Sequence, residues 1–178
     1  MYLNYYAIPL VILVFILSFL LFHIRRYKDA AGSTCFSLLL AATIIYSSFY
    51  ALEISSNTYE TALTFYKLEY IGVPFIPAFF LTFSMRYTGK KKWLNAPTLV
   101  SIFAVPLITM VLVLTIGGHT LYHKEIFFST ETIFPALVYE PGPWYIIQEF
   151  YNVLCIMLGQ VHCCLIHGLR SCLLSGNR

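Results

Sequence analysis

Charged residues are scarce in this sequence. Asp, Glu, Lys and Arg make up 11% of the 178 residues, while hydrophobic residues make up 59%. Soluble globular domains carry roughly 25% charged residues. A chain of this size cannot cover a water-facing surface with so few charges, which excludes an ordinary soluble protein and indicates a polytopic membrane protein. The lipid bilayer is therefore the first partner that the composition implies.

Catalytic and cofactor-binding patterns are also missing. The sequence has no nucleophile–base motif, phosphate-binding glycine loop, metalloprotease motif or kinase signature, so we do not expect the chain as given to be an enzyme. We expect no nucleic-acid partner and no cofactor. The His162–His167 segment places only Cys163 and His167 on one helix face, which is too few ligands for a closed zinc site. No Lys or Arg precedes the first apolar run, so a cleaved signal peptide is not expected.

The cysteine pattern does not indicate disulfides. All five cysteines fall inside apolar segments or at their predicted inner ends, where small, soft side chains serve packing. They are Cys35, Cys155, Cys163, Cys164 and Cys172.

Five apolar segments are long enough to cross a bilayer, which takes about 20 helical residues. They are residues 5–24, 33–54, 62–87, 94–116 and 143–166. Two β-prone runs, 121–128 and 133–139, predict a short hairpin within residues 119–141. The predicted fold is an all-α, five-span transmembrane bundle over residues 1–166, with a β-hairpin between the last two spans and a cytoplasmic tail at 167–178.

Basic residues orient this bundle. Nine of the eleven lie on one side of the predicted membrane, and only Lys67 and Lys124 lie towards the other. The positive-inside rule then places the amino terminus and the hairpin outside and the carboxyl terminus in the cytoplasm.

The third span holds most of the candidate functional residues. Lys67 and Glu69 are two residues apart, so they point to different sides of a helix and cannot simply pair with each other. Candidate partners for Lys67 are Glu60 and Glu149. Two interpretations stay open: two separate charges near the outer interface, with Lys67 snorkelling, or a polar, outward-open pocket formed by the third and fifth spans under the hairpin.

Glycine and proline punctuate the same span. Gly72, Pro74 and Pro77 predict bend points in a helix that transmits a signal. Outside the spans, His119 and His123 could sense pH or a metal ion or could be solvated loop histidines. Trp144 follows Gly-Pro at the start of the fifth span, where an indole suits the membrane interface.

Three stretches carry a family resemblance. The run EYIGVPFIPAFFLTFSMRYTG (69–89), the histidine-bearing segment IGGHTLYH (116–123) and the run YEPGPWYIIQEFY (139–151) resemble the amino-terminal seven-transmembrane sensor region of bacterial histidine kinases. The same region also precedes diguanylate cyclases. The resemblance covers most of residues 5–154.

The resemblance implies a sensor in the bacterial plasma (inner) membrane. In that family seven spans, with the amino terminus outside, pass a signal through the last helix to a cytoplasmic output domain, and the intact proteins form homodimers. Because this sequence has five spans and no output domain, we expect a truncated or frame-shifted product. The candidate signal, ligand or packing positions are Lys67, Glu69, Tyr70, Gly72, Pro74, Pro77, His119, Trp144, Glu149 and Tyr151.

These observations predict a membrane-embedded sensory input module that detects an unknown small molecule or membrane state. A small-solute transporter subunit is one alternative, since transporters also use spans broken by Gly and Pro. A structural membrane protein without a ligand is another, and it predicts that Lys67 and Glu69 tolerate apolar replacement.

Overall fold

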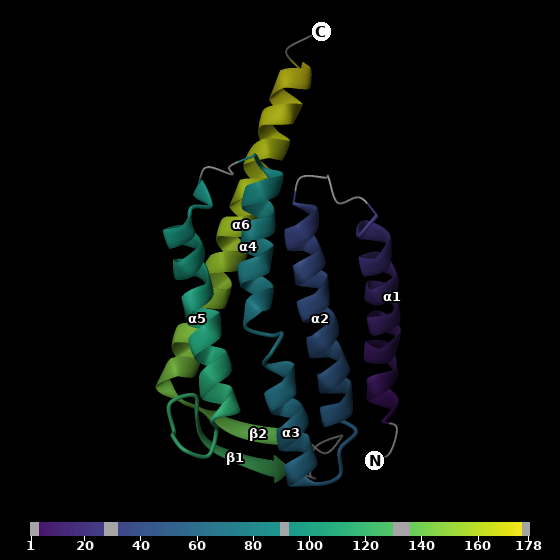
Figure 1. Ribbon diagram of the computed structural model, residues 1–178, viewed down its shortest axis with the longest axis vertical. Helices are drawn as coiled ribbons and strands as arrows, with labels where there is room; N and C mark the ends of the chain where they lie inside the picture. Colours follow the sequence, from purple (N-terminus) through teal and green to yellow (C-terminus); the bar gives the residue numbers. More distant parts are fainter. Residues whose placement is uncertain (1–3, 27–31, 90–92, 130–135, 176–178) are drawn as a thin grey trace.

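The structure, a computed structural model, describes residues 4–26, 32–89, 93–129 and 136–175, with side chains described as far as Cys164. The fold is mostly helical (73%) with one small two-stranded sheet. In chain order the elements are η1 (Tyr5–Ala7), α1 (Ile8–Ile24), α2 (Ser33–Glu53), α3 (Tyr59–Glu69), α4 (Phe75–Tyr87), α5 (Ala96–Leu114), β1 (His123–Ser129), β2 (Ala136–Pro141) and α6 (Pro143–Ser175). The long helices run side by side, the sheet closes one end of the bundle, and α6 extends beyond the others at the opposite end (Figure 1).

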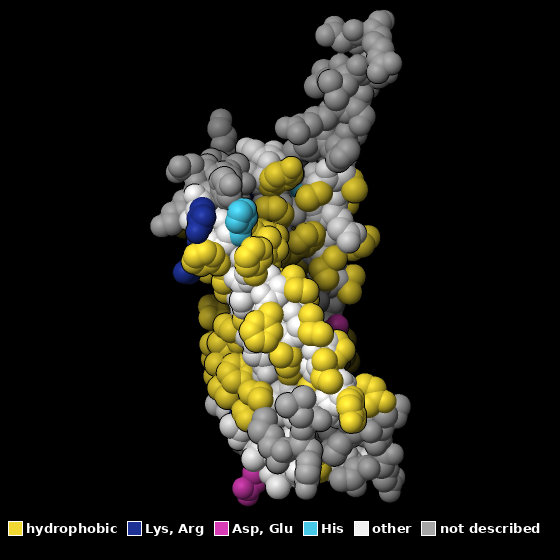
Figure 2. All heavy atoms as spheres, turned by 90° about the vertical axis from the view of Figure 1, so that its right-hand side faces the viewer, with side chains coloured by type: hydrophobic (Ala, Val, Ile, Leu, Met, Phe, Trp, Pro, Cys, Tyr) yellow, Lys and Arg dark blue, Asp and Glu magenta, His cyan; other side chains and the backbone are white. Residues whose placement is uncertain are grey.

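Within the described part of the chain, three helical segments are long and apolar enough to cross a membrane: Tyr5–Ile24, Ser33–Glu53 and Ala96–Leu114. They lie where the first, second and fourth spans are predicted. The helix α1 buries none of its residues, and Phe15 and Phe19 are 72% and 73% exposed. Figure 2 shows hydrophobic side chains over the middle of this face, with Lys, Arg and His side chains towards one end. Such a surface suits lipid rather than water.

The predicted third span is not one helix, which corrects the prediction of a continuous helix over 62–87. The helix α3 ends at Glu69, residues 70–74 form turns, and α4 begins at Phe75. Pro74 and Pro77 lack the N–H groups that would bond the carbonyls of residues 70 and 73 in an α-helix. The turn instead uses shorter bonds, including Gly72 N to Glu69 O at 2.9 Å and Ile76 N to Val73 O at 3.3 Å.

Close packing against α2 sets the position of this break. Gly72 is buried, and a Cβ atom added to it would overlap the carbonyl oxygen of Ala42 in α2. Only glycine lets the two backbones approach so closely. On the same side of the bundle, Phe36 of α2 packs on Phe83 of α4, with ring centroids 5.1 Å apart. The break therefore lies inside the bundle and not in a surface loop.

A second proline is accommodated differently. Pro106 lies inside α5 and cannot donate to the carbonyl of Ile102, four residues earlier. The Tyr151 hydroxyl of α6 donates to that carbonyl instead, at 2.6 Å. A side chain of one helix thus replaces the backbone bond that the other helix lacks.

The predicted hairpin is confirmed. Strands β1 and β2 pair antiparallel, with Ile126 opposite Tyr139 and Ser129 opposite Ala136. The register shifts between His123 and Ile126, which marks a bulge. The residues between the two predicted β-prone runs lie mostly outside the described residues, as do Lys28 and the lysines at 90–92.

Candidate functional site

Aromatic side chains from four elements meet where the hairpin covers the bundle. Tyr66 comes from α3, Tyr70 from the turn after it, Tyr122 from the position just before β1, His123 from the first residue of β1, Tyr139 from β2 and Tyr145 from α6. We call these six residues the tyrosine–histidine cluster. Tyr66, Tyr70, Tyr122 and His123 are all buried. Tyr122 is thus part of the core.

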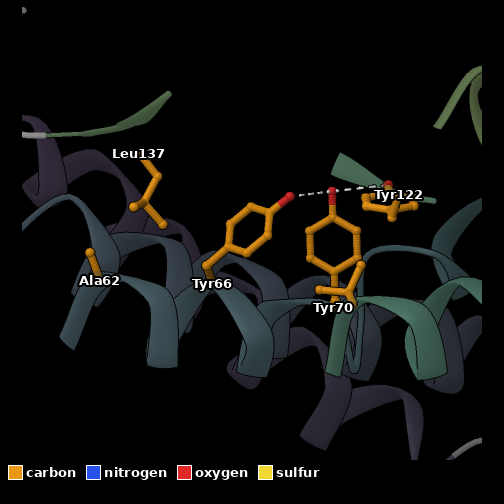
Figure 3. Packing of buried hydrophobic residues seen from close by; sticks show 6 residues of the cluster. Ala62, Tyr66, Tyr70, Tyr122 and Leu137 are labelled. Atoms are coloured by element: carbon orange, nitrogen blue, oxygen red, sulfur yellow. Dashed lines mark hydrogen bonds between the residues drawn. The ribbon is translucent and has the colours of Figure 1, made fainter. Parts of the chain in front are cut away.

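Hydrogen bonds connect the buried hydroxyls of this cluster. The Tyr66 and Tyr122 hydroxyls both donate to the Tyr70 hydroxyl, each at 3.1 Å (Figure 3). The Tyr66 oxygen also hydrogen-bonds to Nε2 of His123. Buried hydroxyls stabilise a fold when their partners are present and destabilise it when one partner is lost. The network therefore links α3 and the turn after it to β1.

Aromatic rings surround His123. Its ring centroid lies 4.3 Å from that of Tyr139 and 4.6 Å from that of Tyr122. Burial lowers the pKa of His123 to about 4, and the backbone of Glu140 opposes this shift. The imidazole is therefore neutral at physiological pH, which corrects the interpretation of His123 as a solvated loop histidine. Burial likewise raises the pKa of Tyr139 to about 12, so its hydroxyl keeps its proton.

The start of α6 fixes the position of β1. Gly142 N donates to the Tyr122 carbonyl at 2.8 Å, and Trp144 N donates to the Leu121 carbonyl at 3.0 Å. A Cβ atom on Gly142 would overlap the Leu121 carbonyl, so glycine permits this contact. The Gly-Pro-Trp motif at the start of α6 thereby holds Tyr122 and His123 in place.

A cavity of about 350 Å³ lies beside the cluster. It is lined by Tyr59, by the loop from Ile116 to Thr120 and by the segment from His123 to Ile126. His119 lines it and hydrogen-bonds through Nε2 to the Thr115 hydroxyl at 3.0 Å. The predicted pocket was expected between the third and fifth spans, whereas this cavity is lined by the first residue of α3, by the loop after α5 and by β1.

A pair of acidic side chains lies deeper in the bundle. Glu69 is 5% exposed and Glu53, the last residue of α2, is 6% exposed. Their carboxyl groups hydrogen-bond each other. Such a bond requires a proton on one of them, because two carboxylates can only accept. Glu69 is therefore not a separate charge: its partner is a second carboxyl group, on α2.

Lys67 does not use the predicted acidic partners. Its ammonium group donates to the carbonyl of Ile116, just past the end of α5, at 3.4 Å. The side chain is half-buried, so it joins α3 to the loop that lines the cavity. Glu60 is exposed at the start of α3, and Glu149 is exposed on α6.

Polar side chains also join α5 to α6. The Trp144 indole donates to the Thr109 hydroxyl at 2.9 Å, and that hydroxyl donates to Gln148 at 2.6 Å. Gln148 donates to Asn152 at 2.8 Å, and Asn152 donates to Glu149 at 3.3 Å. Trp144 is thus a bundle contact as well as the first aromatic of α6, and Glu149 is the exposed end of a polar chain.

The structure divides the predicted site residues into separate groups. Tyr70 belongs to the cluster, Glu69 to the carboxyl pair, and Gly72, Pro74 and Pro77 to the helix break. Trp144 and Tyr151 contact α5, and Glu149 faces solvent. His119 lines the cavity. Sequence reasoning missed Glu53, Tyr66, Thr109 and Gln148. The sequence could have indicated Glu53, because it lies at the end of the second predicted span, at the same level of the bundle as Glu69 in the third.

The family model described as the N-terminal 7TM region of histidine kinase matches residues 8–170. Neither a curated protein nor a solved structure matches the chain. The family match covers nearly all of the described bundle, including the broken third segment, the hairpin and α6. The chain therefore belongs to the family of N-terminal seven-transmembrane sensor regions of histidine kinases.

Proposed function

We propose that the chain is the input module of a bacterial two-component sensor, embedded in the inner membrane with its amino terminus and hairpin outside. The histidine kinase family supplies the class of function. The observation that supports a sensing role most directly is the tyrosine–histidine cluster, which joins the hairpin to the segment just before a break in a bundle helix. A signal at the hairpin would thus act on an element with a built-in bend point.

We propose that the chain crosses the membrane five times. The segment α3–α4 and the first part of α6 run alongside the three apolar helices (Figure 1). The broken segment is tolerated in a membrane because its irregular backbone is buried in protein, next to α2. The basic residues at the end opposite the hairpin support the proposed orientation.

The contacts offer a route from the cluster to α6. Tyr70 stands at the break, α4 follows it, and α4 packs closely on α6. A Cβ atom on Gly159 of α6 would meet the Phe80 ring at 2.6 Å, and the Cys163 thiol donates to the Ser84 hydroxyl at 3.6 Å. We propose that a shift of α4 is passed on to α6. We also propose that the sensor acts as a homodimer.

Reporter fusions test the orientation. Alkaline phosphatase fused after Gly118 should be active, because that enzyme folds outside the cytoplasm, and green fluorescent protein fused after Gly89 should be fluorescent. The opposite pattern at both positions would refute the proposed orientation.

A chimera tests the sensing role. The chain is joined at its carboxyl end to the catalytic core of a histidine kinase whose response regulator drives a reporter gene. We expect Tyr70→Phe, which removes a shared hydrogen-bond partner from the cluster, to shift reporter output at unchanged membrane abundance. Tyr87→Phe, at an exposed position of α4, is the matched control. Equal output from all three chains would contradict the proposal, and solute uptake without any output change would favour a transporter.

A further inference from the structure

The hydrogen bond between Glu53 and Glu69 has no source of hydrogen outside the pair. Both side chains are more than nine-tenths buried, at 6% and 5% exposed. Oε2 of each side chain is buried without a donor from any other described residue. The neighbouring hydroxyls of Ser55 and Ser56 donate to backbone carbonyls of α2, each at 2.8 Å. The contact between the two carboxyl groups therefore depends on a proton that they share.

Among the described residues, no lysine or arginine balances a second negative charge at this place. Lys67, the nearest basic residue along the chain, donates to the Ile116 carbonyl instead. The titratable groups that interact with the pair are tyrosines, which supply no positive charge: Tyr46 and Tyr50 of α2, Tyr66 of α3 and Tyr139 of β2. Without the shared proton, two carboxylates would be in contact in a medium of low dielectric constant, where like charges repel strongly.

The pair lies directly before the break in the third segment. The Glu69 carbonyl accepts from Gly72 N at 2.9 Å and from Val73 N at 3.1 Å, so a shift of Glu69 moves the turn at residues 70–74. On the other side of the pair, Glu53 is the last residue of α2, and residues 57–61 after it are exposed. In the proposed orientation this is the outer end of the bundle, so the proton exchanges with external water.

We propose that Glu53 and Glu69 form a proton-binding site through which the chain responds to external pH. With the proton bound, the hydrogen bond holds the end of α2 to the end of α3. When the proton is released to external water, two carboxylates remain, their repulsion separates the helix ends, and the turn at residues 70–74 shifts. The inference rests on the proposed sensor function, for which it names the proton as the signal.

Infrared difference spectroscopy on the full chain in lipid nanodiscs detects this proton, because a protonated carboxyl group has a C=O stretching band that a carboxylate lacks. The pH is raised from about 6 to about 9, a range in which buried glutamates titrate and exposed ones do not. We expect the band of one carboxyl group per chain at the lower pH and its loss at the higher pH. A double variant with Glu53→Gln and Glu69→Gln should lack the band. Glu60→Gln, at an exposed acid of α3, should keep it.

The kinase chimera tests whether the proton controls output. Bacterial cells hold their cytoplasmic pH nearly constant, so a change of external pH acts on the sensor and not on the kinase core. Between the two external pH values the wild-type chimera should change its reporter output about fivefold or more, the lower end of the usual coupling between two sites. The double variant should keep the low-pH output at both values, because two amides hydrogen-bond without a titratable proton. Glu60→Gln should follow the wild-type chain.

Several results would overturn the inference. A wild-type spectrum without the band, a band that the double variant retains, or a band that persists unchanged to about pH 9 would each show that the pair does not exchange a proton in this range. The infrared measurement involves no kinase, so it stands apart from the sensor function. A chimera that responds to Tyr70→Phe but not to external pH would refute the proton signal and keep the sensor function, whereas a chimera that responds to neither would refute both.

Discussion

Replacing Tyr151 with phenylalanine should destabilise the contact between α5 and α6, and the size of the effect should depend on Pro106. In the native chain the Tyr151 hydroxyl is the donor that reaches the Ile102 carbonyl, at 2.6 Å. Pro106 cannot supply the helical N–H for that carbonyl. Tyr151→Phe therefore leaves a carbonyl without a partner inside the bundle.

The loss of unfolding free energy caused by Tyr151→Phe depends on whether the Ile102 carbonyl finds another donor. Removing one partner of a buried hydrogen bond costs about 1–3 kcal/mol in water-soluble proteins, and bonds between membrane helices average nearer 0.6 kcal/mol. We expect about 1–2 kcal/mol, since the proline removes the usual alternative partner. In a Pro106→Ala background the new N–H can bond Ile102, and the same Tyr151→Phe change should cost less than about 0.5 kcal/mol.

A double-mutant cycle measures this coupling. The four chains are unfolded at equilibrium by sodium dodecyl sulfate in mixed micelles, with tryptophan fluorescence as the signal. The Cys155 thiol next to Tyr151 is common to both backgrounds, so its contribution cancels. Tyr5→Phe, at a residue 85% exposed, controls for loss of a hydroxyl alone. Equal costs of Tyr151→Phe in both backgrounds would refute the assignment of the hydroxyl to the carbonyl freed by proline.

Three further changes probe other parts of the bundle, all by the same unfolding measurement. Gly72→Ala should cost about 1–3 kcal/mol through overlap with the α2 backbone, whereas Gly118→Ala, whose added Cβ has its nearest neighbour at 3.6 Å, should change stability little. Glu69→Gln should be tolerated because its amide can donate to Glu53, while Glu69→Leu should cost about 1–3 kcal/mol by removing that partner. Acid should destabilise the native chain, since His123 is protonated near pH 6.5 when unfolded but only near pH 4 when folded. The free energy of unfolding thus has its full value above pH 6.5 and falls as the pH drops towards 4. We expect the fall to be about 1–2 kcal/mol, since water in the adjacent cavity screens part of the effect. The variant His123→Gln should remove this pH dependence.

Local sequence patterns predicted the elements whose signals are local. Unbroken apolar runs marked α1, α2 and α5, β-prone runs marked the hairpin, and Gly-Pro-Trp marked the start of α6. The prolines correctly indicated irregularity in the third segment. Whether they would bend or interrupt the helix was not decided locally, because the interruption also depends on Gly72 meeting Ala42 of α2.

The site depended on contacts between segments far apart in the chain. Glu53 and Glu69 form a pair only because α2 packs on α3, and Tyr66 meets His123 only because β1 folds back over α3. Lys67 illustrates the same limit: charge complementarity suggested Glu60 or Glu149, while the partner is a carbonyl at the end of α5. No periodicity in the sequence distinguishes a backbone partner from an acidic one.

The two irregular helical segments have opposite mechanical consequences. At Pro106 a side chain from α6 satisfies the freed carbonyl, and Thr109 bonds both Trp144 and Gln148, so α5 and α6 are held together at successive turns. At residues 70–74 the backbone satisfies itself through short-range bonds, and no such side-chain bridge is formed there among the described residues. The segment α3 is held to the hairpin by the cluster, whereas α4 is held to α6 at Gly159. The hairpin is itself held to the start of α6 by Gly142 N and Trp144 N. The segments α3 and α4 are thus tied to two separate points of α6, its start and Gly159, and a bend of α6 between these points would be absorbed between Tyr70 and Pro74.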